Sequence, residues 1–283
     1  MTASTPSNAR GLGRTALNAV RALSFAAVLA VGVGAASASF ADPENAPALQ
    51  AFNSRQYQQA VDLTTKTIAA KENVEALYIR GNAYNALGNF PAAIADFEKA
   101  KALAVAANAG PMIVGINNSL VTSYMFSGQT DKGVAVYKEM KAKSPTDTRA
   151  DDVLIQGFQA QANNAMRAGK TGDAITALER AATEVPARSG PLYAVAAYYM
   201  STTQGADWRK VQAEAGKALA VDPNNARANY VMGVALANSN DTPGAIAALQ
   251  KAKANVGSDA NLGKDVDAAL SALQPAAAPA PKG

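Results

Sequence analysis

Apolar and small residues in the middle of the chain follow one another at intervals of three and four positions. In the clearest stretch these positions are Leu77, Gly81, Tyr84, Ala93, Phe97 and Ala100. Such intervals place side chains on one face of an α-helix. The interruption at Gly88-Asn89-Phe90, followed by Pro91, has the residue types of a turn between two helices. The pattern therefore predicts an antiparallel helix pair, in which the small residues let the two helices approach closely.

The same arrangement recurs along the chain, around turns at residues 128–130, 169–171 and 240–242. A less regular copy is anchored by Trp208, and a degenerate first copy keeps Tyr57. The copies begin near residues 41, 74, 114, 155, 192 and 226, which gives steps of 33, 40, 41, 37 and 34 residues. The two longest steps predict longer helices or loops at 104–113 and 143–152. A further amphipathic segment at 261–273 is expected to cover the open end of the last pair.

This repetition resembles the tetratricopeptide repeat, a helix–turn–helix unit of about 34 residues. The resemblance covers residues 41–273 and implies an all-α fold: a right-handed superhelix of about six helix pairs with a C-terminal capping helix. Arg80 stands where the family usually has Leu. We expect its side chain to extend between neighbouring units, with contact to a ligand as the alternative. In the fifth copy Tyr193, Tyr198 and Tyr199 compete for the packed position.

In the family, the first helix of each pair lines a concave groove that takes peptides or partner helices. Carried over residue by residue, the resemblance implies a groove rich in side-chain amides, which both donate and accept hydrogen bonds. The implied peptide-binding residues are Tyr78, Asn82, Asn85, Asn118, Thr122, Met125, Gln159, Asn163, Met166, Arg167, Arg227 and Tyr230, with Asn238 beside them. The alternative is that these polar residues only keep the surface soluble.

Composition excludes several kinds of chemistry. The chain has no Cys and no His, so it lacks disulfides, thiolate nucleophiles, the commonest general base and the commonest metal ligand. Residues 168–171 end like a phosphate-binding loop. Such a loop also needs a glycine five residues before Gly169, where this chain has Asn164, so the segment is predicted to be a plain turn. No enzyme activity, cofactor or metal is therefore predicted.

Three acidic segments have simpler interpretations than a catalytic or cation site. Asp151-Asp152 fits the opening of a helix, where carboxylates favour the helix dipole, and Asp222 with Asn224 and Asn225 fits a turn. Asp96 and Glu98 are expected on a solvated helix face.

The net charge of +4 is concentrated at the N-terminus. Arg10, Arg14 and Arg21 are not balanced by any acid in the first 41 residues, which leaves 23 basic and 22 acidic side chains in the rest. A nearly neutral chain with interspersed signs argues against nucleic acid as the partner.

The first 41 residues have the three parts of an export signal: a basic region, an apolar region at 23–34 and small residues at 35–41. We expect cleavage before Ser39 or Asp42, with an uncleaved membrane anchor as the alternative. The Ala/Pro tail at 274–283 is expected to be disordered.

The sequence thus predicts a signal peptide (1–41), a repeat domain (42–273) and a tail (274–283). The predicted function is that of an exported, periplasmic or secreted scaffold that binds a protein or peptide in the bacterial cell envelope. The alternatives are an accessory subunit or unrecognised enzyme of cell-wall or polysaccharide assembly, and an oligomeric structural array.

Overall fold

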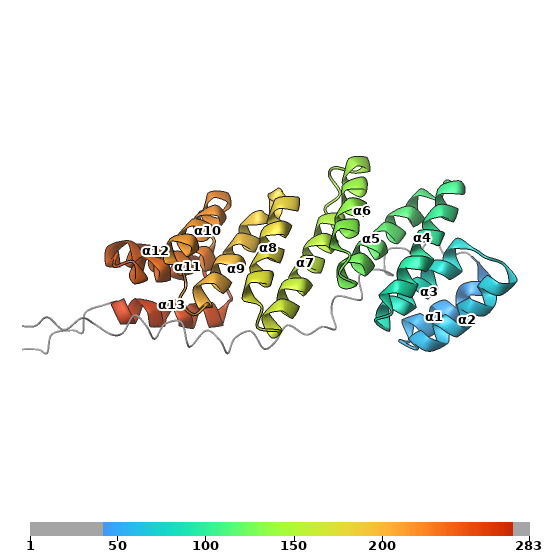
Figure 1. Ribbon diagram of the computed structural model, residues 1–283, viewed down its shortest axis with the longest axis horizontal. Coiled ribbons are helices and arrows are strands. Elements are labelled where there is room, and N and C mark those ends of the chain that lie inside the picture. The colour runs from blue at the N-terminus through green and yellow to red at the C-terminus, as the bar shows by residue number, and fades with distance from the viewer. Residues whose placement is uncertain (1–41, 274–283) are drawn as a thin grey trace, which may run out of the picture. The chain divides into compact units, whose positions relative to one another are not determined.

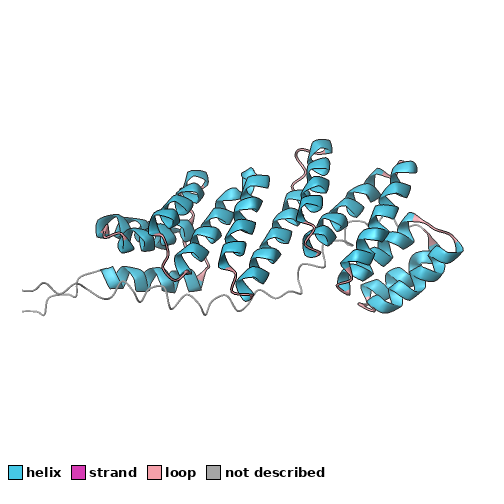
Figure 2. Cartoon of the chain, viewed as in Figure 1, coloured by secondary structure: helices cyan, strands magenta, loops and turns pink. Residues whose placement is uncertain are grey.

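The computed structural model describes residues 42–273, so the predicted signal peptide and tail lie outside the described residues. Within this range the chain forms thirteen α-helices and two short 3-10 helices, η4 (Pro43–Asn45) and η5 (Pro186–Arg188), and no strand (Figures 1 and 2). The predicted all-α fold is confirmed.

Twelve of the helices form six consecutive pairs, and the thirteenth follows the last pair, as the repeat pattern predicts. The pairs are α1 (Ala46–Asn53) with α2 (Tyr57–Ala70), α3 (Val74–Ala86) with α4 (Phe90–Ala106), α5 (Gly110–Phe126) with α6 (Thr130–Lys143), α7 (Arg149–Arg167) with α8 (Thr171–Glu184), α9 (Ser189–Thr202) with α10 (Trp208–Val221), and α11 (Ala226–Asn238) with α12 (Thr242–Asn255). The closing helix is α13 (Ala260–Leu273).

The described chain divides into two compact units, residues 42–161 and 162–273. The first unit contains α1 to α6 and most of α7, and the second contains the end of α7 and α8 to α13. Each unit is described by itself below.

The long repeat steps arise mainly from long helices. Helices α4 and α5 have 17 residues each and α7 has 19, whereas α3 and α11 have 13. Between α6 and α7 the chain also inserts residues 144–148. Both predicted extensions are therefore present.

The predicted turns between paired helices are confirmed, and a residue in the left-handed backbone region lies in each. Gly88, Gly128 and Gly169 have φ angles of 77°, 79° and 71°, which glycine adopts without a steric penalty. The turn after α11 instead uses Asn240 at φ 65°, one of the few other residues that tolerate this region.

The core of the first unit depends on close approach between α3 and α4. A Cβ atom placed on Gly81 would lie 2.6 Å from Cε1 of Phe97, and the Phe97 side chain is fully buried. Leu77 and Ala93 complete this contact and are also buried. The small residues of the repeat pattern therefore make room for an aromatic ring on the facing helix.

In the second unit, the fifth copy packs with smaller residues. Ala196 of α9 and Ala215 of α10 are both fully buried, and Tyr198 and Tyr199 are buried as well, whereas Tyr193 is half-buried. Of the three tyrosines that the sequence offered for the packed position, Tyr198 and Tyr199 are therefore the buried ones.

Helix α13 closes the second unit as expected. Its residues Leu262, Val266 and Leu270 lie on one face and are buried, and the helix packs against α12. No helix within residues 42–273 combines the length and apolar character needed to cross a membrane.

Candidate functional site

The first helices α3 and α5 are joined by an amide–hydroxyl network. The Asn82 side chain donates from Nδ2 to the Tyr78 carbonyl oxygen (2.8 Å), and its Oδ1 accepts from the Ser119 hydroxyl of α5 (3.2 Å). One turn further along, Asn85 Oδ1 accepts from the Ser123 hydroxyl (2.9 Å). Both side-chain amides therefore form hydrogen bonds within the first unit.

Five of the residues assigned to the groove are almost completely buried. Their exposed fractions are 1% for Tyr78, 8% for Asn82, 6% for Asn85, 1% for Met125 and 6% for Tyr230. These side chains are not displayed on the isolated chain, which corrects that part of the expected groove. The reason is that neighbouring helices cover the positions that a repeat pattern alone marks as lining.

Tyr78 and Met125 show how this burial arises. The Tyr78 hydroxyl would lie only 3.2 Å from a Cβ atom on Gly115 of α5, and burial raises the pKa of Tyr78. Met125 packs against two glycines, because a Cβ on Gly157 of α7 would lie 2.7 Å from Met125 Cγ and one on Gly133 would lie 3.0 Å from its Sδ. Both side chains serve packing between helices.

The other groove residues keep exposed surface. In the first unit, Asn118 and Thr122 of α5 are half-buried and Gln159 of α7 is exposed. The Thr122 hydroxyl donates to the Asn118 carbonyl oxygen (3.1 Å), whereas the Asn118 side-chain oxygen is buried and accepts no hydrogen bond.

In the second unit, Asn163 and Met166 are half-buried and Arg167 is exposed, all at the end of α7. Asn238, also half-buried, donates its amide to the Val234 carbonyl oxygen (2.8 Å) within α11.

Arg227 of α11 is engaged within its own unit. Its guanidinium pairs with Asp259 (3.2 Å) and lies 5.6 Å from the centre of the Tyr198 ring. Asp259 in turn accepts from the backbone N–H of Leu262 (3.0 Å), in the first turn of α13. Arg227 therefore stabilises the start of the closing helix α13 through Asp259.

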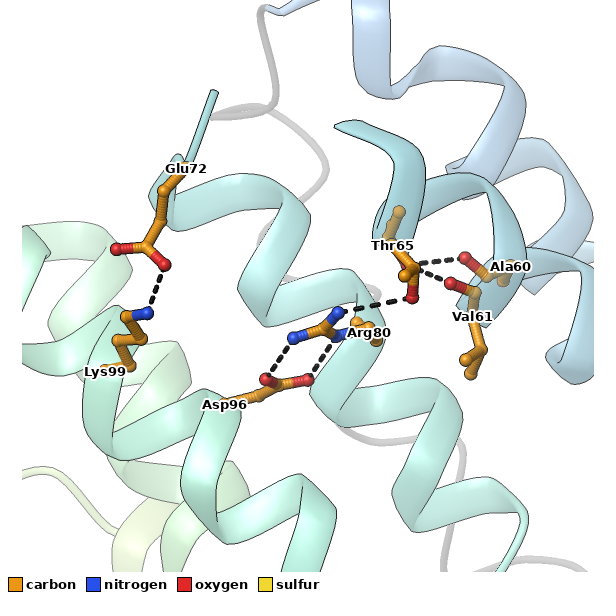
Figure 3. Close-up of polar contacts among 8 residues, drawn as sticks. Ala60, Val61, Thr65, Glu72, Arg80, Asp96 and Lys99 are labelled. Atoms are coloured by element: carbon orange, nitrogen blue, oxygen red, sulfur yellow. Dashed lines mark hydrogen bonds and ion pairs between the residues drawn. The ribbon is translucent and has the colours of Figure 1, made fainter. Parts of the chain in front are cut away.

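Arg80 and Asp96 form a two-pronged ion pair between α3 and α4 (Figure 3). Nε and Nη2 of Arg80 each lie 2.8 Å from a carboxylate oxygen of Asp96, and Nη1 donates to the Thr65 hydroxyl of α2 (3.2 Å). The two side chains are 18% and 9% exposed. These hydrogen bonds raise the pKa of Arg80.

This geometry decides between the two expectations for Arg80, because the side chain spans three helices of neighbouring copies instead of facing solvent. It also corrects the prediction for Asp96, which is buried and not on a solvated face. The exposed Glu98 accepts a hydrogen bond from the Tyr124 hydroxyl of α5.

An acidic cluster is formed by Glu179 of α8 and Glu214 of α10. The Glu214 side chain is 4% exposed and its Oε2 accepts from Lys217 Nζ (2.7 Å), while Oε1 is buried and accepts no hydrogen bond. The Lys217 ammonium lies 5.3 Å from the centre of the Tyr193 ring of α9. Burial, followed by the charge of Glu214, raises the pKa of Glu179 on α8.

Sequence reasoning did not identify this cluster. The available signal was an acid at the seventh residue of the second helix. Among the six second helices described, only α4 and α10 have one there, as Asp96 and Glu214.

The remaining acidic segments have structural roles. Asp151 lies in the first turn of α7, as expected, and is buried, where it accepts from the Tyr137 hydroxyl (2.8 Å) and pairs with Lys141 (3.2 Å). Asn225 accepts from the Ala228 backbone N–H (2.9 Å) and so caps α11, which confirms the predicted turn. Residues 42–273 do not bring three potential metal-ligating side chains together.

Two family models with the description "tetratricopeptide repeat" match the sequence. One match covers residues 74–104, which are α3 and most of α4, and the other covers residues 206–260, from just before α10 to the start of α13. None of the curated proteins matches.

Similar solved structures are also helical-repeat proteins. The C-terminal part of a TPR repeat-containing protein from Cytophaga hutchinsonii is 17% identical, with 82% of this chain and 96% of that chain covered and a TM-score of 0.45. The TPR2AB-domain:pHSP90 complex of yeast Sti1 is 17% identical, with coverage of 83% and 99% and a TM-score of 0.37. YrrB, a TPR protein with an unusual peptide-binding site, is 15% identical, with coverage of 72% and 97% and a TM-score of 0.37.

At these identities and scores the solved structures carry no inference about the ligand of this chain. The two family matches fall on helix pairs in two different parts of the chain, and the repeat register found between them has the same helix–turn–helix form. The chain contains tetratricopeptide repeats, which the two family models place at residues 74–104 and 206–260.

Proposed function

We propose that this chain is an exported scaffold that binds a protein or peptide partner in the bacterial cell envelope. Repeat proteins of this kind use the surface of their stacked helices for binding and need no catalytic groups. The basic, apolar and small-residue segments of the first 41 residues support export. The proposal assigns no catalysis to the chain.

The observation that carries the binding proposal is the division of the side-chain amides into two groups. Asn82 and Asn85 already bond to Ser119 and Ser123, whereas the Asn118 side-chain oxygen accepts no hydrogen bond. A polar atom of this kind gains stability when a donor is supplied. Asn118 and the exposed Gln159 are therefore the proposed contacts of the first unit, and Asn163 and Met166 are those of the second.

The test is capture of partners from envelope extracts by the purified chain and its variants. Asn118→Ala with Gln159→Ala, and separately Asn163→Ala with Met166→Ala, should reduce partner retention while circular dichroism stays unchanged. Each amide hydrogen bond removed contributes roughly 0.5 to 1.5 kcal/mol. Met166→Ala removes an apolar contact instead, so each pair of changes should weaken binding several-fold.

Controls on α4 and α12 are Lys99→Ala and Lys251→Ala, which change exposed side chains. Full retention by both pairs of variants, or loss only in the lysine variants, would refute the proposed contacts. Export is tested separately by the intact mass of the protein from the envelope fraction, which should begin at Ser39 or Asp42. A membrane-bound form that retains Arg10 would refute cleavage.

A further inference from the structure

The second unit contains an acidic counterpart of the Arg80–Asp96 pair. Thr65, Arg80 and Asp96 are the ninth residue of α2, the seventh of α3 and the seventh of α4. The same positions of α8, α9 and α10 hold Glu179, Val195 and Glu214. A second carboxylate thus replaces the hydroxyl, and a valine replaces the arginine that neutralises the buried acid in the first unit.

The result is a buried carboxylate that is only half paired. Asp96 receives a guanidinium nitrogen at each oxygen, whereas Glu214 receives one ammonium at Oε2 and nothing at its buried Oε1. A buried charged oxygen without a donor costs free energy. The neighbouring Glu179 carboxylate adds a second negative charge, so the cluster has one ammonium for two carboxylates.

Lys217 shows that a cation can reach this cluster from the surface. Its side chain is 51% exposed, and its ammonium nevertheless lies 2.7 Å from Glu214 Oε2 and 5.3 Å from the centre of the half-buried Tyr193 ring. An ammonium is a compact point charge, whereas a guanidinium has a planar fork of donors that bonds to two oxygens and stacks on aromatic rings. The geometry therefore favours a guanidinium over the resident ammonium.

We propose that Glu179, Glu214 and Tyr193 form a binding site for an arginine side chain of the partner protein, which displaces Lys217 into solvent. The guanidinium donates to oxygens of Glu214 and Glu179, whereas that of Arg80 donates to the two oxygens of Asp96, and its plane stacks on the Tyr193 ring. This inference rests on the proposed function as a protein-binding scaffold and adds the chemistry of the partner: a segment with an exposed arginine.

The probe for this site is a five-residue peptide, Gly-Ala-Arg-Ala-Gly with blocked ends, compared with the same peptide carrying citrulline in place of arginine. Citrulline has the same shape without the charge. In a titration of the full isotope-labelled chain followed by nuclear magnetic resonance, the arginine peptide should shift backbone amide signals of α8 to α10. Its dissociation constant should be at least ten times lower than that of the citrulline peptide.

The double variant Glu179→Gln, Glu214→Gln keeps side-chain size and should weaken binding of the arginine peptide at least tenfold. Asp173→Asn, which removes an exposed carboxylate from the same helix α8, is the matched control and should bind as the parent does. Val195→Arg should place an internal guanidinium in the cluster, abolish binding of the peptide and raise the melting temperature. If Val195→Arg fails to fold, the glutamine variants still decide the question.

Equal binding of both peptides by the parent, or unchanged binding by the double glutamine variant, would overturn the inference. Partner capture separates this result from the proposed function. If the partner is retained by the double glutamine variant and lost from the Asn118 and Asn163 variants, the scaffold function stands and the arginine site is wrong.

Discussion

The second and fifth copies of the repeat have the same helix positions and fill them in opposite ways. In the second copy a buried acid is neutralised by Arg80 of the same copy, and the arginine also reaches Thr65 of the preceding copy. In the fifth copy the equivalent acid, Glu214, has only a surface lysine, and the residue in place of Arg80 is Val195. In the second copy both oxygens of the buried acid are paired, whereas in the fifth copy one oxygen of Glu214 has no donor.

The two copies also differ in the sizes of the apolar residues at equivalent positions of their paired helices. The eighth residues of α3 and α4 are Gly81 and Phe97, and those of α9 and α10 are Ala196 and Ala215. A Cβ on Gly81 would clash with Phe97 at 2.6 Å, whereas the two alanines at these positions of the fifth copy are both fully buried.

The sixth copy is packed like the second: Gly233 of α11 faces a large residue, Leu249 of α12. This comparison shows that packing between paired helices is set by the combined size of two facing residues. Either residue alone can therefore vary between copies.

The largest expected effect is the loss of Arg80. Arg80→Val gives the second copy the residue of the fifth and leaves Asp96 buried without its cation, which should lower the free energy of unfolding by about 3 to 5 kcal/mol. Denaturant unfolding measures this change. Arg80→Val with Asp96→Ala should recover much of the loss, and a single variant as stable as the parent would show that the ion pair does not hold the interface.

A smaller effect is expected from Gly81→Ala, which forces a Cβ against Phe97 and should cost about 1 to 3 kcal/mol by overpacking. In the background of Phe97→Ala, which copies the alanine pair of the fifth copy, the same change should become neutral or stabilising, because alanine favours the helix over glycine by about 1 kcal/mol. A double-mutant cycle by thermal unfolding measures this coupling. Equal costs in both backgrounds would contradict the size argument.

The acidic cluster predicts a modest pH dependence. Burial and Glu214 raise the pKa of Glu179 above 4.5, so the folded chain holds this proton more tightly than the unfolded chain. The resulting stability is present at low pH and is lost as pH rises from 4.5 through the raised pKa. Glu179→Gln should remove this loss, which solvent screening keeps below about 1 kcal/mol.

Urea unfolding of parent and Glu179→Gln at several pH values from 4 to 7 makes the comparison. Asp173→Asn serves as the control for removal of an exposed carboxylate. A parent and variant that differ by a constant amount at every pH would contradict the assigned cluster.

The smallest effect is expected at an exposed pair, which sets the scale for the buried ones. Arg149 lowers the pKa of Asp147 to about 2 from its ordinary 3.8. The contribution of this pair is present above pH 3.8 and is lost as pH falls through 2. Because the Arg149 side chain is 67% exposed, Asp147→Asn should cost only about 0.3 kcal/mol at pH 7.

The order of effects, with the buried Arg80 pair far above the exposed Asp147 pair, is itself a test. Calorimetric melting of Asp147→Asn beside Arg80→Val decides it, and comparable losses in the two variants would contradict the importance assigned to burial.

The helix pairs, their turns and the closing helix could all be predicted from the amino-acid pattern. These features depend on local chemistry: intervals of three and four between apolar residues, glycine or asparagine where the backbone is left-handed, and proline at a helix start. The positions of Gly88 and Asn240 in the turns, and of Pro91 at the start of α4, follow from those rules without knowledge of the neighbouring helices.

Which polar side chains are hydrogen-bonded within the chain depends on how the helices pack, and the amino-acid pattern does not predict it. Asn82 and Asn118 both lie on first helices, yet the Ser119 hydroxyl donates to the side-chain oxygen of Asn82, whereas no described residue donates to that of Asn118. Asp96 and Glu214 are both buried acids, and their different states depend on residues 16 positions away in one case and three in the other. A periodic pattern fixes the face of a helix on which a side chain lies, but its hydrogen bonds and its charge balance depend on what the adjoining helices place opposite it.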